Sequence, residues 1–113
     1  MSDEQPPDQS ADPVVAQYRR QISDADLAIL QAVNRRVALV ARLFAYKQEK
    51  GYEKLDPARE DWMLTYLSRA NTGPLTPERL AELYHYLLDL SKAEAGRIAA
   101  REDAPAAPGP PRS

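Results

Sequence analysis

Several cationic side chains are spaced so that they could meet on one small anionic ligand. Arg36 and Lys47 are eleven residues apart, which in a helix places them within about 20° of one another and about 16 Å apart along the axis. Their long side chains could converge on one anion, although each alone could extend into solvent. Arg59 lies three residues before Trp62 and four before Met63, so it continues their apolar stripe. It also lies in the first turn of a helix, where the helix dipole disfavours a cation. Because it breaks two local patterns, Arg59 is a candidate for function.

Three further polar residues are candidates, two of which also have an ordinary structural explanation. Asp56 precedes Pro57 and is a good helix N-cap, which explains it without a ligand. Glu60 lies beside Arg59, and Ser91 lies on the apolar stripe of the last helical segment, where a hydroxyl more often bonds to its own helix backbone. Several cations with one or two carboxylates suit a small dianion, acted on by orientation and electrostatics instead of covalent chemistry.

Arg19 could take part in the same site only from a second chain. It lies one turn before Ile22 and seventeen residues before Arg36, which is about 25 Å along a helix. The two arginines therefore cannot share a pocket within one chain. In an antiparallel dimer, Arg19 of one chain could reach the site of the other.

The composition excludes several other kinds of site. The chain has 113 residues, with 15 Lys and Arg against 17 Asp and Glu, which argues against a general nucleic-acid binder. It has no cysteine and one histidine, His85, so thiolate or multi-histidine metal sites, cysteine nucleophiles and a conventional Ser-His-Asp triad are not expected. No apolar run is long enough to span a bilayer, and the acidic, proline-rich N-terminus is unlike a signal peptide. We expect a cytoplasmic protein.

Helix-breaking residues divide the chain into three helical segments, which predicts an all-α fold. The first segment runs from about Pro13 to Lys50, has no proline or glycine after Pro13, and carries apolar side chains at helical spacing up to Gly51. The pairs Asp56-Pro57 and Thr76-Pro77 each combine an N-cap with proline at the first helical position, and so begin two further helices. The Pro- and Asp-rich residues 1–13 and the Pro- and Ala-rich residues 102–113 offer little to bury, so we expect two disordered tails around a helical domain at 14–101.

The length of the first helix predicts a dimer. A helix of some 35 residues is roughly 50 Å long, whereas the radius of gyration of a compact domain of this size is near 13 Å. Two shorter helices of about 15 and 23 residues cannot cover its whole apolar stripe. An intertwined homodimer could cover it. The alternatives are a lone helical hairpin and a long coiled coil. The dimer is favoured because the apolar stripe is wider than the strict seam of a coiled coil.

Taken as a set, these residues resemble the all-helical, AroQ-type chorismate mutases. The shared pattern consists of Tyr18 to Asp26, Asn34-Arg35-Arg36, Lys47, Gly51, Asp56 to Glu60, and Gly73-Pro74-Leu75 before a final helix that reaches Ser91. The resemblance covers about residues 15–94. It implies an intertwined dimer of three-helix chains, without cofactor or metal, that rearranges chorismate to prephenate for aromatic amino acid biosynthesis.

The resemblance also implies roles for the catalytic cations. Arg19 of the partner chain and Arg36 would bind the two substrate carboxylates, which guanidinium groups hold bidentately. Lys47 would donate to the ether oxygen, where negative charge develops as the C–O bond breaks.

The remaining candidates would hold other parts of the substrate. Arg59 would help to position a carboxylate, Ser91 would line the carboxylate end, and Glu60 with the backbone near Asp56 would hold the ring hydroxyl.

The sequence departs from the family pattern after Ser91. The family usually has Gln or Glu one turn later as a second donor to the ether oxygen, whereas a gap-free reading places Ala95 there and Glu94 one residue early. Either a local shift of the helix brings Glu94 into the site as a protonated catalytic acid, or the site lacks this donor. In the first case, activity should fall as pH rises through the pKa of Glu94.

Other functions on the same fold remain open. An isochorismate-pyruvate lyase would use the same cations for an elimination. A 4-amino-4-deoxychorismate mutase would have Glu60 facing an ammonium in place of a hydroxyl. A non-catalytic dimeric partner of a shikimate-pathway enzyme would use Tyr84, Tyr86 and surface arginines as an interface.

Overall fold

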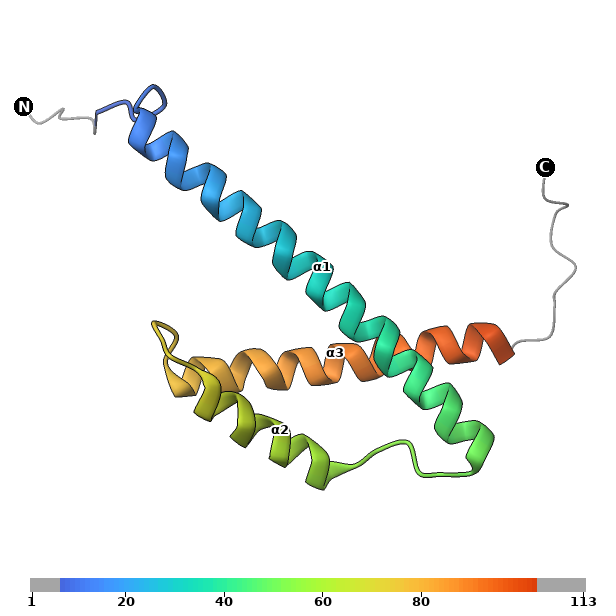
Figure 1. The fold of residues 1–113 in the computed structure, drawn as a ribbon. Coiled ribbons are helices and arrows are strands. Elements are labelled where there is room, and N and C mark those ends of the chain that lie inside the picture. Colours follow the sequence, from blue (N-terminus) through green and yellow to red (C-terminus); the bar gives the residue numbers. More distant parts are fainter. Residues whose placement is uncertain (1–6, 104–113) are drawn as a thin grey trace, which may run out of the picture. The chain divides into compact units, whose positions relative to one another are not determined.

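The computed structural model describes residues 7–103 and contains three helices in that range, shown in Figure 1. They are α1 (Pro13–Lys50), α2 (Pro57–Ala70) and α3 (Pro77–Asp103). The described residues include no strand, so the all-α prediction is confirmed. None of these helices is long and apolar enough to cross a membrane.

The helical domain is slightly longer than the sequence predicted. Helix α1 begins at Pro13 and ends at Lys50, as predicted for the first helical segment, so it starts one residue before the expected domain boundary at 14. At the other end, α3 continues to Asp103, two residues beyond the expected boundary at 101. The disorder predicted for residues 1–6 and 104–113 concerns parts of the chain outside the described residues.

Local hydrogen bonds explain where each helix ends or begins. At the end of α1 the amide of Tyr52 donates to the carbonyl of Lys47 at 2.8 Å, and the amide of Gly51 donates to the carbonyl of Gln48 at 3.2 Å. This is the Schellman pattern, and Gly51 adopts the left-handed φ of 75° that it requires. The Asp56 carboxylate accepts from the amide of Arg59 at 3.1 Å and so caps α2.

The third helix has the same kind of start. Thr76 Oγ1 accepts a hydrogen bond from the amide of Arg79 at 3.2 Å, directly before the first turn of α3. In the short connection from α2, the side chain of Asn71 donates to the carbonyl of Leu75 at 2.8 Å and accepts from the amide of Gly73 at 3.0 Å. The turn therefore brings α3 directly after α2.

The chain divides into two units, residues up to 34 and residues from 35 onward. The first unit contains the N-terminal part of α1 and exposes a row of large apolar side chains. Tyr18 is 63% exposed, Ile22 60% and Ile29 59%. Within this unit, a single helix leaves these large apolar side chains uncovered.

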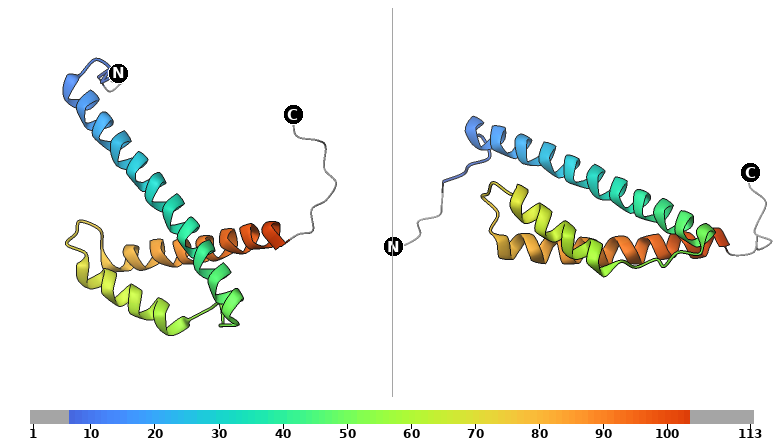
Figure 2. Two further views of the ribbon diagram at one scale, coloured as in Figure 1. Left: turned by 45° about the vertical axis from the view of Figure 1, so that its right-hand side comes forward. Right: turned by 60° about the horizontal axis from the view of Figure 1, so that its bottom comes forward.

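The second unit contains the remainder of α1, with α2 and α3. Helices α2 and α3 lie side by side in every view (Figure 1, Figure 2). Its most buried apolar side chains are Phe44 from α1 and Leu80, Leu88 and Ala95 from α3. Ser91 is also 1% exposed, so a hydroxyl is enclosed among them.

Candidate active site

A cavity of about 250 Å³ lies within the second unit. Its walls come from the C-terminal part of α1, the segment before α2, and helices α2 and α3. The polar lining residues are Arg36, Lys47, Lys54, Asp56, Arg59, Glu60, Ser91 and Lys92. The apolar lining residues are Val40, Leu43, Phe44, Leu55, Met63 and Leu88.

The guanidinium of Arg36 is held by residues of the two other helices. Its Nη1 donates to Ser91 Oγ at 2.6 Å, and its Nη2 lies 3.7 Å from the sulfur of Met63. Both partners are neutral, so they orient the guanidinium without cancelling its charge. Ser91 thus accepts a hydrogen bond from another helix, in addition to any role in packing.

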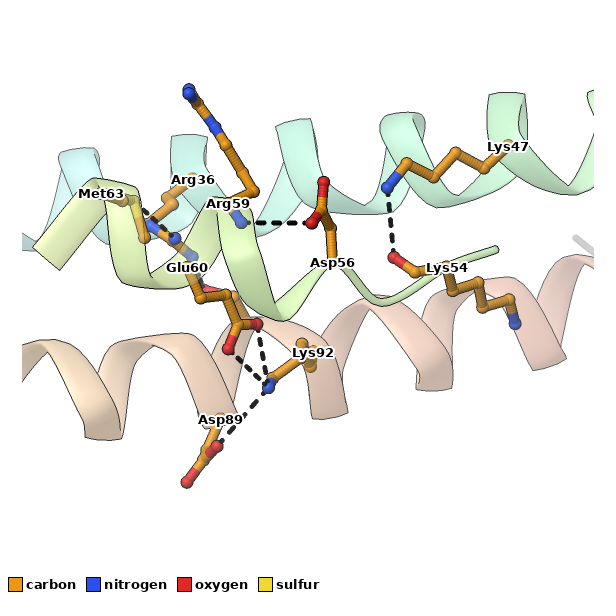
Figure 3. Close-up of polar contacts among 10 residues, drawn as sticks. Arg36, Lys47, Lys54, Asp56, Arg59, Glu60, Met63, Asp89 and Lys92 are labelled. Carbon is orange, nitrogen blue, oxygen red and sulfur yellow. Dashed lines mark hydrogen bonds and ion pairs between the residues drawn. The ribbon is translucent and has the colours of Figure 1, made fainter. Parts of the chain in front are cut away.

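Lys47 is held by backbone at the other end of the cavity. Its Nζ donates to the carbonyl of Lys54 at 3.3 Å, as Figure 3 shows. The Schellman turn at Gly51 directs the chain back along α1, which brings that carbonyl to Lys47. This contact uses one of the three donors of an ammonium group.

Glu60 and Lys92 form an ion pair across α2 and α3. Lys92 Nζ lies 3.1 Å from one carboxylate oxygen of Glu60 and 3.4 Å from the other (Figure 3). The Asp89 carboxylate is 3.9 Å from the same ammonium on its outer side, and its own side chain is 82% exposed. Both members of the Glu60–Lys92 pair are about one third exposed, so the pair is partly shielded from water.

Arg59 lines the cavity but its charge is directed elsewhere. The centre of its guanidinium lies 4.1 Å from the centroid of the Trp62 ring, a cation–π contact. Trp62 in turn stacks on Tyr66, with ring centroids 5.2 Å apart and planes 6° from parallel. In Figure 3 the Arg59 side chain points away from the carboxylates of Asp56 and Glu60.

The cavity as a whole has an excess of positive charge. Five cationic side chains and two carboxylates line it, beside an apolar wall. Such a site attracts a small organic anion and gives its carbon skeleton an apolar surface to lie on. Among residues 7–103, no group of three or more His, Cys, Asp or Glu side chains could hold a metal ion.

Residues 18–95 match the protein-family model for chorismate mutase type II. The chain belongs to the type II chorismate mutase family. Members of this family are isomerases. The resemblance identified in the sequence is therefore confirmed.

A solved structure agrees with this assignment. The chain is similar to chorismate mutase (form II) from Thermus thermophilus, with 28% sequence identity and a TM-score of 0.70. The similarity covers 74% of this chain and 94% of the Thermus chain. A comparison with curated protein sequences gave no significant match.

Six of the eight candidate residues of this chorismate mutase family member line one cavity. They are Arg36, Lys47, Asp56, Arg59, Glu60 and Ser91. Helical spacing predicts that Arg36 and Lys47 share a side of α1, and both line the cavity.

The other two candidates lie elsewhere in this chain. Arg19 is exposed on the part of α1 that belongs to the first unit. Glu94 does not line the cavity, and its carboxylate pairs with Arg97 Nε at 3.0 Å one turn later on α3. Ala95, which stands at the family's usual donor position, has no exposed surface.

Lys54 and Lys92 are the polar cavity residues that sequence reasoning missed. Lys54 contributes its backbone carbonyl to Lys47, and Lys92 contributes its ammonium to Glu60. The position of Lys92 did carry a signal in the sequence. Lys92 follows Leu88 by four residues and therefore shares a side of α3 with a residue of the apolar stripe. That spacing was a usable signal, like the one that singled out Arg59. By contrast, nothing in the sequence indicates that Lys92 pairs with Glu60 on another helix.

Proposed function

We propose that this protein rearranges chorismate to prephenate in the cavity described above, as a step in aromatic amino acid biosynthesis. The observation that carries the proposal is the meeting of Arg36 and Lys47 in one cationic cavity of a type II chorismate mutase fold. Chorismate carries two carboxylates on a small, partly apolar skeleton, which fits the charge and the wall of this cavity.

The reaction needs only orientation and electrostatic stabilisation from the protein. It is an intramolecular [3,3] rearrangement, in which the ether C–O bond breaks while a C–C bond forms between the enolpyruvyl side chain and the ring. No proton is transferred and no electron acceptor is required. A cavity that holds the side chain over the ring converts binding energy into the reactive geometry.

Arg36 would bind one substrate carboxylate. Its guanidinium is already oriented by the Ser91 hydroxyl and keeps its full charge, so a carboxylate gains a charge-assisted, bidentate hydrogen bond without prior reorganisation. Arg59 would contribute to the same task after leaving the face of Trp62.

Lys47 would act on the bond that breaks. Its ammonium is held by one backbone carbonyl and keeps donors for the ether oxygen of the substrate. Negative charge grows on that oxygen in the transition state, so this contact strengthens as the reaction proceeds and raises kcat. Glu60 and the backbone at Asp56 would accept from the ring hydroxyl.

A homodimer would complete the site. The row of exposed apolar side chains on the N-terminal part of α1 supports a second copy packed against it. Arg19 of the partner chain would then bind the second substrate carboxylate. Within this proposal, Glu94 would act as an additional acid only if α3 shifted and released it from Arg97.

The test is product analysis with a matched pair of lysine variants. The wild-type protein is incubated with chorismate and the products are separated by chromatography. Lys47→Ala should abolish prephenate formation, whereas Lys50→Ala should retain it, because Lys50 is exposed on the same helix and its ammonium lies over the Tyr46 ring, 5.7 Å from the centroid.

The other outcomes identify the alternatives. Formation of salicylate and pyruvate from isochorismate, without conversion of chorismate, would show that the protein is an isochorismate-pyruvate lyase. Conversion of 4-amino-4-deoxychorismate alone would show that the protein is a 4-amino-4-deoxychorismate mutase. A folded dimer that converts none of the three would support a non-catalytic partner of a shikimate-pathway enzyme.

A further inference from the structure

The end of the cavity next to Glu60 contains a charge that the reaction itself does not require. Lys92 Nζ contacts both oxygens of the Glu60 carboxylate, at 3.1 and 3.4 Å, and both residues line the cavity. Lys92 comes from α3 and Glu60 from α2, so the pair spans the two helices. The Lys92 side chain is only 31% exposed, and its ammonium contacts Glu60 instead of extending into open solvent, so the charge at this position calls for an explanation.

We propose that Lys92 determines the specificity of the Glu60 end of the cavity, by reserving that carboxylate for a neutral hydroxyl donor and excluding a ligand ammonium. This inference rests on the proposed function, since it concerns the substituent at the ring position of chorismate that carries the hydroxyl.

The reason is the charge balance at the carboxylate. A carboxylate has about four acceptor sites, so Glu60 can keep its contact with Lys92 and still accept a hydrogen bond from a substrate hydroxyl. A substrate ammonium at the same place would lie within a few ångströms of the Lys92 ammonium. The two like charges would repel each other, and one of them would lose part of its attraction to Glu60.

The other neighbour of Lys92 does not remove this repulsion. The Asp89 carboxylate is 3.9 Å from the ammonium and its side chain is 82% exposed, so water screens most of its effect. Lys92 also neutralises Glu60 toward the substrate as a whole. Without it, an unpaired carboxylate would face a ligand that carries two negative charges.

The experiment measures a ratio of specificities. The value of kcat/KM is determined for chorismate and for 4-amino-4-deoxychorismate with the wild type, Lys92→Met, Lys92→Gln and Lys92→Arg. We expect the wild type and the arginine variant to share a preference for the hydroxyl substrate. In the methionine and glutamine variants the ratio should shift toward the amino substrate by about tenfold, the size expected for a partly solvated charge contact.

Several variants separate charge from shape and from folding. Glutamine retains a donor to Glu60 without charge, so a shift in both neutral variants assigns the effect to charge. Asp89→Asn removes the outer neighbour of Lys92 and should leave the ratio within about twofold of the wild type. Circular dichroism of each variant is recorded to check that it is folded.

The inference is overturned if the ratio stays within about twofold of the wild type in both neutral variants, or if Lys92→Arg shifts it as far as Lys92→Met does. Binding of the two compounds is measured by calorimetry alongside. If the wild type converts neither compound, the proposed function fails, and the ratio of the two dissociation constants still decides the role of Lys92.

Discussion

Replacing Ser91 with alanine should weaken substrate binding without affecting the bond that breaks. Ser91 is 1% exposed and its Oγ accepts from Arg36 Nη1 at 2.6 Å, so the substitution removes the contact that orients the guanidinium. A buried hydrogen bond to a charged group contributes about 1.5–3 kcal/mol. Arg36 is only half-buried, so water replaces part of the loss, and about 1.4 kcal/mol remains, which corresponds to a factor of ten.

This loss should appear in KM. In the proposed function Arg36 holds a substrate carboxylate in the ground state and in the transition state alike, so a misoriented guanidinium weakens both by similar amounts. We therefore expect KM for chorismate to rise about tenfold while kcat stays within about twofold. Alanine fits the space of serine, so the packing around Leu88 and Ala95 should be preserved.

Steady-state kinetics of chorismate conversion provide the assay. Ser68→Ala, an exposed serine on α2, is the matched control and should behave as the wild type. A Ser91→Ala enzyme with unchanged KM would refute the view that the hydroxyl orients a carboxylate-binding arginine. A tenfold loss in kcat alone would also refute it, because the hydroxyl would then act on the transition state.

Three further predictions test the dimer, the second acid and the end of α1. Arg19→Ala and Arg36→Ala should each be nearly inactive. A refolded equal mixture of the two should regain about a quarter of the wild-type sites, because half of the dimers would be mixed and one of the two sites in each would be intact. A mixture without activity would contradict the donation of Arg19. Glu94→Gln should leave both the rate and its pH profile unchanged, because the carboxylate pairs with Arg97 outside the cavity, and a lost decline at high pH would show that Glu94 is the acid after all. Gly51→Ala should lower the free energy of unfolding by about 1 kcal/mol, as measured by thermal denaturation, because residue 51 has a φ of 75° that a side chain disfavours. A Cβ there would meet nothing within 4 Å, so no clash adds to this cost. An unchanged midpoint would show that the turn relaxes.

The parts of the fold that could be predicted are those that depend on neighbouring residues. The ends of the helices follow from caps and breakers, so Gly51, Asp56 and Thr76 lie where their local chemistry predicts. The common side of Arg36 and Lys47 follows from the helical period alone. Each of these inferences uses contacts within a few turns of one helix.

The parts that could not be predicted depend on contacts between helices. Lys92 shares a side with Leu88, but nothing along α3 indicates that Glu60 of α2 is its partner. The direction of Arg59 depends on a local competition between Trp62 and the cavity, which spacing does not decide. The choice between Glu94 and Ala95 depends on the rotation of α3 against the rest of the unit, and one residue of helix corresponds to about 100°.

The cations of the cavity differ in what holds them, and this difference has a chemical consequence. Arg36 is oriented by a hydroxyl and a sulfur, and Lys47 by a backbone carbonyl, so both keep a full charge for a ligand. Lys92, by contrast, is paired with a carboxylate of the cavity. Neutral acceptors allow a protein to fix the direction of a cation before the substrate arrives without cancelling its charge, and the electrostatic stabilisation of a transition state depends on such preorganisation. The cations held by neutral groups are therefore the ones available to a dianion. The cation held by a carboxylate instead offsets the charge of that carboxylate and influences which groups can approach it.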